Sequence, residues 1–270
     1  MEYAIQQGIP QIYLTRNIVL SRTLVLDENV YIELHLSGYR LDATGAYDYA
    51  FELYDGSTLI LHGEGGEIVC ASRGLINVPS STSCSITLND GFYVTNATNG
   101  SLIRLDPSNI YTVNVSMNNV SYTDYSGSGF IVDARSFSGA LNLYVIGGTF
   151  YAYAGFDLEG NGICYVESAT ITTSAYAFLI ASNDEVVLRD STITTGKGMI
   201  DGSPLAAVIA ESGAIVHVSK CTINAEGTAY YVDVTGGTII ASENSTWASI
   251  VASNAAGENG SIVIDNVEVD

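Results

Sequence analysis

Three copies of one strand-turn-strand pattern constrain the fold of this chain more than any other feature. They are residues 163–173 (ICYVESATITT), 185–195 (EVVLRDSTITT) and 214–225 (AIVHVSKCTINA). In each copy, alternating apolar and polar residues reach a two-residue polar turn and then resume with Thr and Ile, so one face stays buried through the bend. Such a unit buries its apolar face only against neighbouring copies, and it therefore predicts one coil of a β-solenoid.

The pattern extends over most of the chain when the turn is used as the anchor. The first residue after the turn is placed at Glu67, Phe92, Val120, Thr149, Thr170, Thr192, Thr222, Thr246 and Val267. These positions lie 21 to 30 residues apart, a spread that is ordinary when loops are inserted into individual coils. No Pro-rich or low-complexity linker divides the sequence. We therefore predict one domain over residues 1–270, with a cap at 1–10 and about ten coils over 11–270.

The composition favours an all-β chain with a large core. Hydrophobic residues make up 47% of the chain and charged residues 14%, which argues against disorder. The apolar residues occur in short runs rich in Ile, Val, Leu, Tyr and Ala, which is typical of strands. The opening residues 1–8 (MEYAIQQG) are the exception: they predict about two helical turns that end at Gly8 and cover the first coil.

A resemblance to a known family rests on residues 24–41 (LVLDENVYIELHLSGYRL). This run, with its polar Asp-Glu-Asn turn before an alternating strand, resembles the opening coils of right-handed parallel β-helix modules of the pectin-lyase-like superfamily. Such modules are found in bacterial surface proteins and in phage tailspike or receptor-binding proteins. The resemblance implies a right-handed parallel β-helix, but no single activity, because the superfamily contains lyases, hydrolases, adhesins and inert spacers.

The charge balance limits the partners of the protein. Asp and Glu number 29 against 9 Lys and Arg, a net charge of −20, so nucleic acid is an improbable partner because phosphates would be repelled. An acidic surface can hold Ca²⁺ through carboxylates, although its commoner role is solubility. The sequence shows neither a secretory signal nor an apolar stretch of about 20 residues. We expect a module on an extracellular, cell or virion surface, without membrane insertion.

Cysteine and histidine show no metal-binding spacing in the sequence. The four cysteines form no CxxC pair and have no histidine at zinc spacing. Cys164 and Cys221 are predicted to be core or turn residues, and a Cys70–Cys84 disulfide is the less favoured alternative. The three histidines, His35, His62 and His217, are interpreted as structural or surface residues.

Aromatic residues between 129 and 160 suggest a sugar-binding surface. In the run FYAYA, Tyr151 and Tyr153 are two positions apart, so we expect them to share one face of a strand while Phe150 points to the core. Two such rings would lie about 7 Å apart along a strand and could stack on sugar rings. Tyr176 is the third candidate of this kind.

Candidate catalytic groups follow from what the resemblance implies. Pectate lyases of that superfamily combine Asp ligands for Ca²⁺ with a basic Arg or Lys on neighbouring coils. The residues that could take such roles here are Asp157, Glu159, Asp184, Arg189, Asp190 and Lys197. Asp157 and Glu159 are two positions apart and are expected to face solvent together. The NTD, DD, GHG and RIK strings of polygalacturonase-like members do not occur in this sequence.

Three functional hypotheses remain open. The first is a non-catalytic surface or virion module whose rigid coils bind a glycan or receptor. The second is a lyase or hydrolase acting on an acidic polysaccharide, which a groove lined by the candidate residues would favour and a flat face would not. The third is a purely structural assembly protein. The chain ends inside a predicted strand at Asp270. The last coil is therefore expected to dock on another chain, to continue in a longer protein, or to be protected by the charges of Asp265, Glu268 and Asp270 alone.

Overall fold

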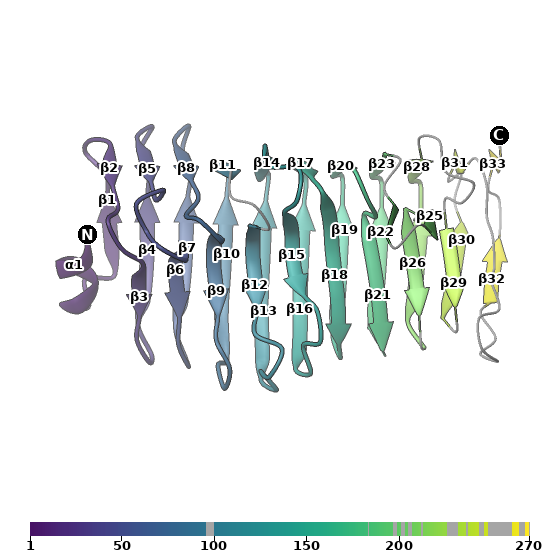
Figure 1. Cartoon of the computed structure of the whole chain (residues 1–270), viewed down its shortest axis with the longest axis horizontal. Coiled ribbons are helices and arrows are strands. Elements are labelled where there is room, and N and C mark those ends of the chain that lie inside the picture. The colour runs from purple at the N-terminus through teal and green to yellow at the C-terminus, as the bar shows by residue number, and fades with distance from the viewer. Residues whose placement is uncertain are drawn as a thin grey trace.

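The protein is a right-handed parallel β-solenoid with one short helix at its N-terminal end. Its computed structural model describes residues 1–95, 100–182, 184–196, 199–200, 203–204, 207–211, 213–225, 232–235, 237–242, 246–247, 261–264 and 268–269. The strands stack along the long axis of the molecule, with the two termini at opposite ends (Figure 1). The predicted all-β class and parallel solenoid architecture are confirmed.

Three long parallel sheets make up the solenoid, and we call them sheets A, B and C. Sheet A contains β1(Gln11–Tyr13), β4(Tyr31–His35), β7(Thr58–His62), β10(Cys84–Asn89), β13(Thr112–Asn118), β16(Ala140–Ile146), β19(Ile163–Glu167), β22(Glu185–Arg189), β27(Ile215–Ser219), β30(Thr238–Ser242) and β32(Ser261–Ile264). Sheet B contains β2(Ile18–Val19), β5(Arg40–Asp42), β8(Glu67–Val69), β11(Phe92–Thr95), β14(Ser121–Asp124), β17(Thr149–Ala152), β20(Thr170–Thr173), β23(Thr192–Thr195), β28(Thr222–Ala225), β31(Thr246–Trp247) and β33(Glu268–Val269).

Sheet C contains β3(Leu24–Leu26), β6(Tyr49–Leu53), β9(Gly74–Val78), β12(Ser101–Leu105), β15(Phe130–Ala134), β18(Ala154–Gly160), β21(Phe178–Ser182), β26(Val208–Glu211) and β29(Val232–Thr235). A separate antiparallel pair, β24(Met199–Ile200) and β25(Ser203–Pro204), lies within the insertion between β23 and β26.

The core lies between the three sheets because alternate side chains of every strand point inward. In sheet A, Leu34 pairs in register with Leu61, and Leu61 pairs with Leu88. All three side chains are fully buried. Since each coil places the same apolar position above the last one, the rows continue from coil to coil, as expected for a stack in which each repeat contacts its neighbours.

The turn predicted from the repeat forms the corner between sheets A and B. Its first residue has a left-handed backbone, with φ between +44° and +57°, at Glu64, Asp90, Asn119, Ser168, Asp190 and Lys220. The strand after this turn begins at the predicted residue in seven coils, namely at Glu67, Phe92, Thr149, Thr170, Thr192, Thr222 and Thr246. In β14 it begins at Ser121, one residue after the predicted Val120, whose side chain is buried at the corner. Val267 lies outside the described residues.

The left-handed corner predicts an effect on stability. A β-branched residue tolerates positive φ poorly, at a cost of about 1–2 kcal/mol. Ser168 is exposed at φ +57°. Because Ser already bears part of this cost, Ser168→Val should lower the free energy of unfolding by roughly 1 kcal/mol. Thr170→Val is the control, because Thr170 is exposed on β20. Equal midpoints of chemical denaturation for the two variants would contradict this role of the corner.

The predicted N-terminal cap is confirmed as α1(Glu2–Gln6). Gly8 follows it at φ +64°, which glycine adopts without steric cost and which ends the helix. Ile5 is buried in the core, and Glu2 forms an ion pair with Arg22. The helix therefore covers the first coil. Within the described part of the chain, no helix is long and apolar enough to cross a membrane.

All four cysteines are buried free thiols. The Cys70–Cys84 disulfide that the sequence left open is therefore wrong. Burial raises the pKa of Cys84 to about 12 and that of Cys221 to about 11, so neither is a reactive thiolate at neutral pH. The predicted interior positions of Cys164 and Cys221 are confirmed.

Candidate functional site

The outer face of sheet C carries a groove of about 760 Å³ across β15, β18 and β21. Its walls combine aromatic and apolar side chains with charged and hydroxyl groups: Ser128, Phe130, Arg135, Tyr153, Asp157, Glu159, Tyr176 and Leu179. A concave, largely apolar surface with a few placed polar groups is the usual form of a small-ligand site.

The coil register brings the acidic residues of the groove together. Val132 and Phe156 are register partners that point into the core. The next residues of the same strands, Asp133 and Asp157, are also partners, and they lie on the opposite face because side chains alternate along a strand. Two carboxyl groups from adjacent coils therefore meet on the outside of sheet C.

Hydrogen bonds hold these carboxyl groups in place. Arg135 donates from Nε to Asp133 Oδ1 at 2.8 Å and from Nη2 to Asp133 Oδ2 at 3.0 Å. Its guanidinium also lies 4.5 Å from the centre of the Phe130 ring, a cation–π arrangement. The Tyr176 hydroxyl donates to Asp157 Oδ2 at 2.6 Å. The polar part of the groove is therefore a fixed network of groups from several coils.

Asp157 has unusual electrostatics for a carboxyl group. Its side chain is buried, with 1% of the residue exposed, and its Oδ1 atom has no hydrogen-bond partner. The pKa of Asp157 is raised to about 7, chiefly by burial, and the charges of Asp133 and Glu159 contribute in the same direction. The Tyr176 hydrogen bond and the Arg135 charge act in the opposite direction. Asp157 is consequently partly protonated near neutral pH.

Tyr176 and Arg135, which lie beside Asp157, keep their ordinary protonation states. Burial, followed by the charge of Asp157, raises the pKa of Tyr176, so it stays a neutral phenol. Hydrogen bonding to Asp133 raises the pKa of Arg135, so it stays a cation. Glu159 Oε2 accepts the backbone N–H of Ser136 at 2.7 Å.

The expectation that Asp157 and Glu159 both face solvent is wrong for Asp157. Both side chains leave the same face of β18, but Tyr176 from the next coil packs over Asp157 and buries it, whereas Glu159 is only half-buried. Alternation along a strand predicts the face of the sheet from which a side chain extends. It does not predict whether a side chain of a neighbouring coil covers it there.

The pair of tyrosines predicted to share one face is divided between two sheets. Strand β17 ends at Ala152, and the chain bends at Tyr153 before entering β18. Tyr153 therefore lines the groove on sheet C, while Tyr151 is 49% exposed on the outer face of sheet B. Tyr176 also lines the groove, so two of the three predicted tyrosines come together there.

Three further candidate catalytic residues, Asp184, Arg189 and Asp190, do not line this groove. Asp184 borders a separate, mainly apolar cavity of about 10 Å³, and burial raises its pKa to about 6. Arg189 lies at the end of β22 in sheet A, with Nε 3.2 Å from Asp190 Oδ2 at the corner and 3.8 Å from Glu167 Oε1. Lys197 lies outside the described residues.

Four residues that line the groove were missed in the sequence, namely Ser128, Phe130, Arg135 and Leu179, and so was Asp133, which holds Arg135. The available signal was the coil period, because Asp133 and Asp157 occupy equivalent positions of successive coils. Leu179 follows at the same position of the next coil. Alignment of whole coils, rather than of their turns alone, would have placed these side chains together.

A second hollow of about 240 Å³ lies on the same face of sheet C, towards the N-terminal end. It is lined by Thr23, Asp48, Tyr49, Glu52, Arg73, Asn77, Arg104 and Asp106. Arg104 is the register partner of Asp133, so the two hollows occupy neighbouring coils. A linear ligand that follows the solenoid axis would cross both of them.

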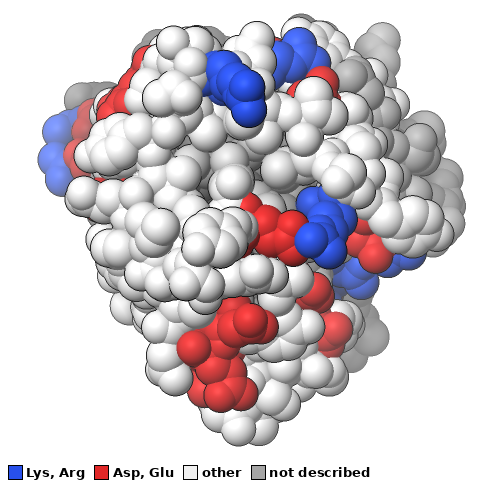
Figure 2. Space-filling view, turned by 90° about the vertical axis from the view of Figure 1, so that its left-hand side faces the viewer, with Lys and Arg blue, Asp and Glu red and all other residues white. Residues whose placement is uncertain are grey.

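Basic side chains of the protein are largely compensated by nearby acids. Arg22, Arg40, Arg73, Arg135 and Arg189 each form an ion pair with a carboxylate. Figure 2 shows this arrangement on the N-terminal end of the solenoid, where blue and red groups occur close together on a mainly uncharged surface. Local pairing of this kind produces little extended positive field for a polyanion.

Comparison of the chain with protein-family models, with curated proteins and with solved structures finds no match in any of the three. The class that the geometry defines is a parallel β-solenoid with a ligand-sized groove on one face.

Proposed function

We propose that the chain is a non-catalytic surface module that binds a glycan in the groove on sheet C. The observation that carries the proposal is the combination of Tyr153 and Tyr176 with carboxyl and guanidinium groups in one hollow of about 760 Å³. Aromatic faces stack on the apolar faces of sugar rings, and fixed polar groups bind hydroxyls. The second hollow beside it provides room for further sugar units of a linear chain.

Burial of Asp157 favours binding over cleavage. A catalytic acid must come within hydrogen-bond reach of the bond that it protonates. Here the unpartnered Oδ1 has essentially no exposed surface, and Oδ2 is engaged by the Tyr176 hydroxyl. Asp133, the neighbouring carboxylate, is engaged by Arg135. These polar contacts therefore shape the groove and orient Tyr176.

The proposal also includes the location at which the module acts. The opening coils resemble modules of the pectin-lyase-like superfamily from bacterial surface and phage proteins, and a rigid solenoid is suited to hold a binding face away from its attachment point. We accordingly place the chain on a cell or virion surface. Asp265 and Asp270, two of the charges expected to protect the last coil, lie outside the described residues.

A second function, cleavage of an acidic polysaccharide, is favoured by one specific observation. A carboxyl group with a pKa of about 7 beside a second carboxylate is the usual property of a general acid in glycoside hydrolysis. In this case Tyr176 would have to move away from Asp157 when substrate binds. Ca²⁺, if it took part, would replace the donors that now occupy these carboxylates.

One experiment separates the two functions. The purified protein is incubated with neutral and acidic polysaccharides, with and without Ca²⁺, and both retention on the polymer and release of reducing or unsaturated ends are measured. We expect retention without release of ends. Release of ends that Asp157→Asn abolishes would establish cleavage instead. If neither retention nor release of ends is observed, a structural assembly protein is the remaining hypothesis.

The groove predicts which tyrosine matters for retention. Tyr153→Ala should weaken binding of the retained polymer by about tenfold or more, since loss of an aromatic contact commonly costs more than about 1 kcal/mol. Tyr151→Ala is the matched control, two residues away but on sheet B, and should bind like the wild type. Dissociation constants from affinity electrophoresis or calorimetry measure the difference. Equal weakening by both substitutions would place the binding face elsewhere.

A further inference from the structure

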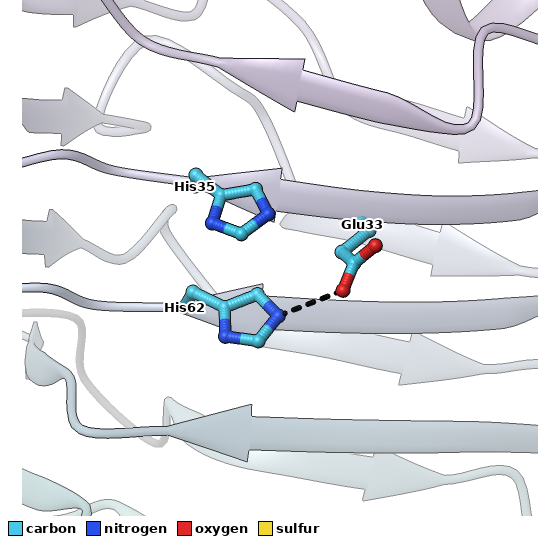
Figure 3. A group of neighbouring side chains, drawn as sticks. All are labelled: Glu33, His35 and His62. Atoms are coloured by element: carbon cyan, nitrogen blue, oxygen red, sulfur yellow. Dashed lines mark hydrogen bonds and ion pairs between the residues drawn. The ribbon is translucent and has the colours of Figure 1, made fainter.

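A group of histidine and carboxylate side chains lies on the outer face of sheet A, near the N-terminal end and away from the groove. His35 on β4 and His62 on β7 are register partners. Their rings are stacked, with centres 4.3 Å apart and planes inclined by 4°, and Tyr13 stacks on the other side of His35. Figure 3 shows the two rings one above the other, each with one nitrogen on the side of Glu33.

Three ligand atoms meet at this place. One nitrogen from each histidine and one carboxylate oxygen of Glu33 all lie within 4.8 Å of one another. His62 Nε2 is 3.1 Å from Glu33 Oε1, while the other oxygen, Oε2, accepts from the Gln11 amide at 2.8 Å. The Glu33 carboxylate is therefore held between Gln11 and His62, with Oε1 on the side of the histidines.

The surroundings of His35 prepare one of its nitrogens as a ligand. His35 Nδ1 is 2.8 Å from Glu64 Oε1. A carboxylate oxygen accepts hydrogen bonds, so Nδ1 of His35 carries the proton of this contact. When the imidazole holds only this one proton, as a metal-bound histidine does, Nε2 has the lone pair. Carboxylates commonly orient metal-binding histidines in this way.

The same Nε2 atom has nothing to bind in the protein. It is buried and has no hydrogen-bond partner, which normally costs about 1–3 kcal/mol. The His35 side chain is 12% exposed and that of His62 26%, so the cluster is enclosed but open to solvent on one side. An unsatisfied lone pair beside a second imidazole and a carboxylate is an arrangement that a cation completes.

We propose that Glu33, His35 and His62 form a zinc-binding site. Two imidazoles and one carboxylate, with a water in the fourth position, are a common tetrahedral ligand set for Zn²⁺. Zn–N distances are about 2.0–2.1 Å, so the two rings must tilt out of their parallel stack until their lone pairs converge. Zn²⁺ replaces the Nε2 proton of His62, which moves to Nδ1 or is released to solvent.

Titration of the full chain with Zn²⁺ in a calorimeter tests this site. We expect one saturable Zn²⁺ per chain, and binding at least about 100-fold weaker after His62→Gln or Glu33→Gln, because each substitution removes a ligand. Glu64→Gln keeps all three ligands and should weaken binding by about 10- to 100-fold, the usual effect of losing an outer hydrogen-bond partner.

His217 supplies the matched control. It lies on the same sheet, on β27, with Nε2 3.8 Å from Glu185 Oε1. His217→Ala should bind Zn²⁺ like the wild type, and circular dichroism should show that every variant retains its strands. Zn²⁺ should also shift the ring NMR signals of His35 and His62 but not those of His217. Two results would overturn the proposal: Zn²⁺ binding by the wild type that does not saturate, or a loss of Zn²⁺ affinity in His217→Ala equal to that in the ligand variants. Either would show only diffuse attraction of the cation to an acidic surface.

Discussion

The gain in the free energy of unfolding on replacing Asp157 by Asn is expected to be larger at pH 8 than at pH 4, by up to about 4 kcal/mol. The folded-state pKa of about 7 lies well above the ordinary value of 3.8, and each tenfold change in proton affinity corresponds to about 1.4 kcal/mol. The folded protein binds the Asp157 proton more tightly than the unfolded chain does. The contribution of this proton to the free energy of unfolding is therefore fully present below pH 3.8 and is lost as the pH rises through 7. Asn is neutral throughout and avoids this loss.

Chemical denaturation of the wild type and of Asp157→Asn at several pH values measures the effect. Asp184→Asn is an informative comparison, since burial raises the pKa of Asp184 only to about 6. Its stabilisation should be complete near pH 6, whereas that of Asp157→Asn should continue to grow up to about pH 7. A difference between wild type and Asp157→Asn that stays constant from pH 4 to pH 8 would mean that Asp157 titrates normally and is not desolvated.

Phe156→Ala is expected to lower the free energy of unfolding by about 3–5 kcal/mol, the range for removal of a fully buried aromatic ring. The Phe156 ring is stacked on Phe178 at 5.0 Å and makes an edge contact with Phe150 at 6.1 Å. It lies directly beneath the groove, since Asp157 follows it on β18. The substitution would leave a cavity that neighbouring coils can fill only partly.

The control for this prediction is Phe92→Ala. Phe92 is a half-exposed ring on β11, so its loss should cost well under half as much. The measurement is the denaturant midpoint followed by far-ultraviolet circular dichroism. Similar midpoints for Phe156→Ala and Phe92→Ala would show that the rings of β18 and β21 do not form a tightly packed part of the core.

The fold could be predicted because its rule is local. Each coil repeats the alternation of a strand and a two-residue turn, and both signals lie within about a dozen residues of sequence. The turn located the start of β20 and β23 correctly because its first residues, Ser168 and Asp190, occupy the same left-handed corner. The side chain of Val120 is buried at its corner, which is why the strand start was placed one residue early there.

The site could be predicted only in part because it depends on the register between coils. Asp157, Tyr153 and Tyr176 were identified and do line one groove. Arg189 was grouped with them, although it lies at the end of β22 on sheet A and not on sheet C. The bend at Tyr153 carries no glycine or proline, so the run FYAYA looked like one uninterrupted strand.

The histidine cluster also depends on the register between coils, so the sequence alone did not predict it. His35 and His62 are one coil apart and are brought together by the pairing of β4 with β7. This separation is far longer than the local spacings by which metal ligands are usually found in a sequence. Once coils are aligned strand by strand, the coincidence of the two histidines becomes visible.

Hydrogen exchange with and without an oligosaccharide of the retained polymer tests the central claim most directly. The proposed binding face predicts that added protection is confined to the groove segments on sheet C, residues 128–135, 153–159 and 176–179, with extension towards 73–77 and 104–106 for longer oligosaccharides. The backbone amides of sheets A and B should exchange at the same rate with and without the oligosaccharide. Protection centred on sheet A or sheet B, with the sheet C segments unchanged, would contradict the assignment of the groove as the glycan-binding site.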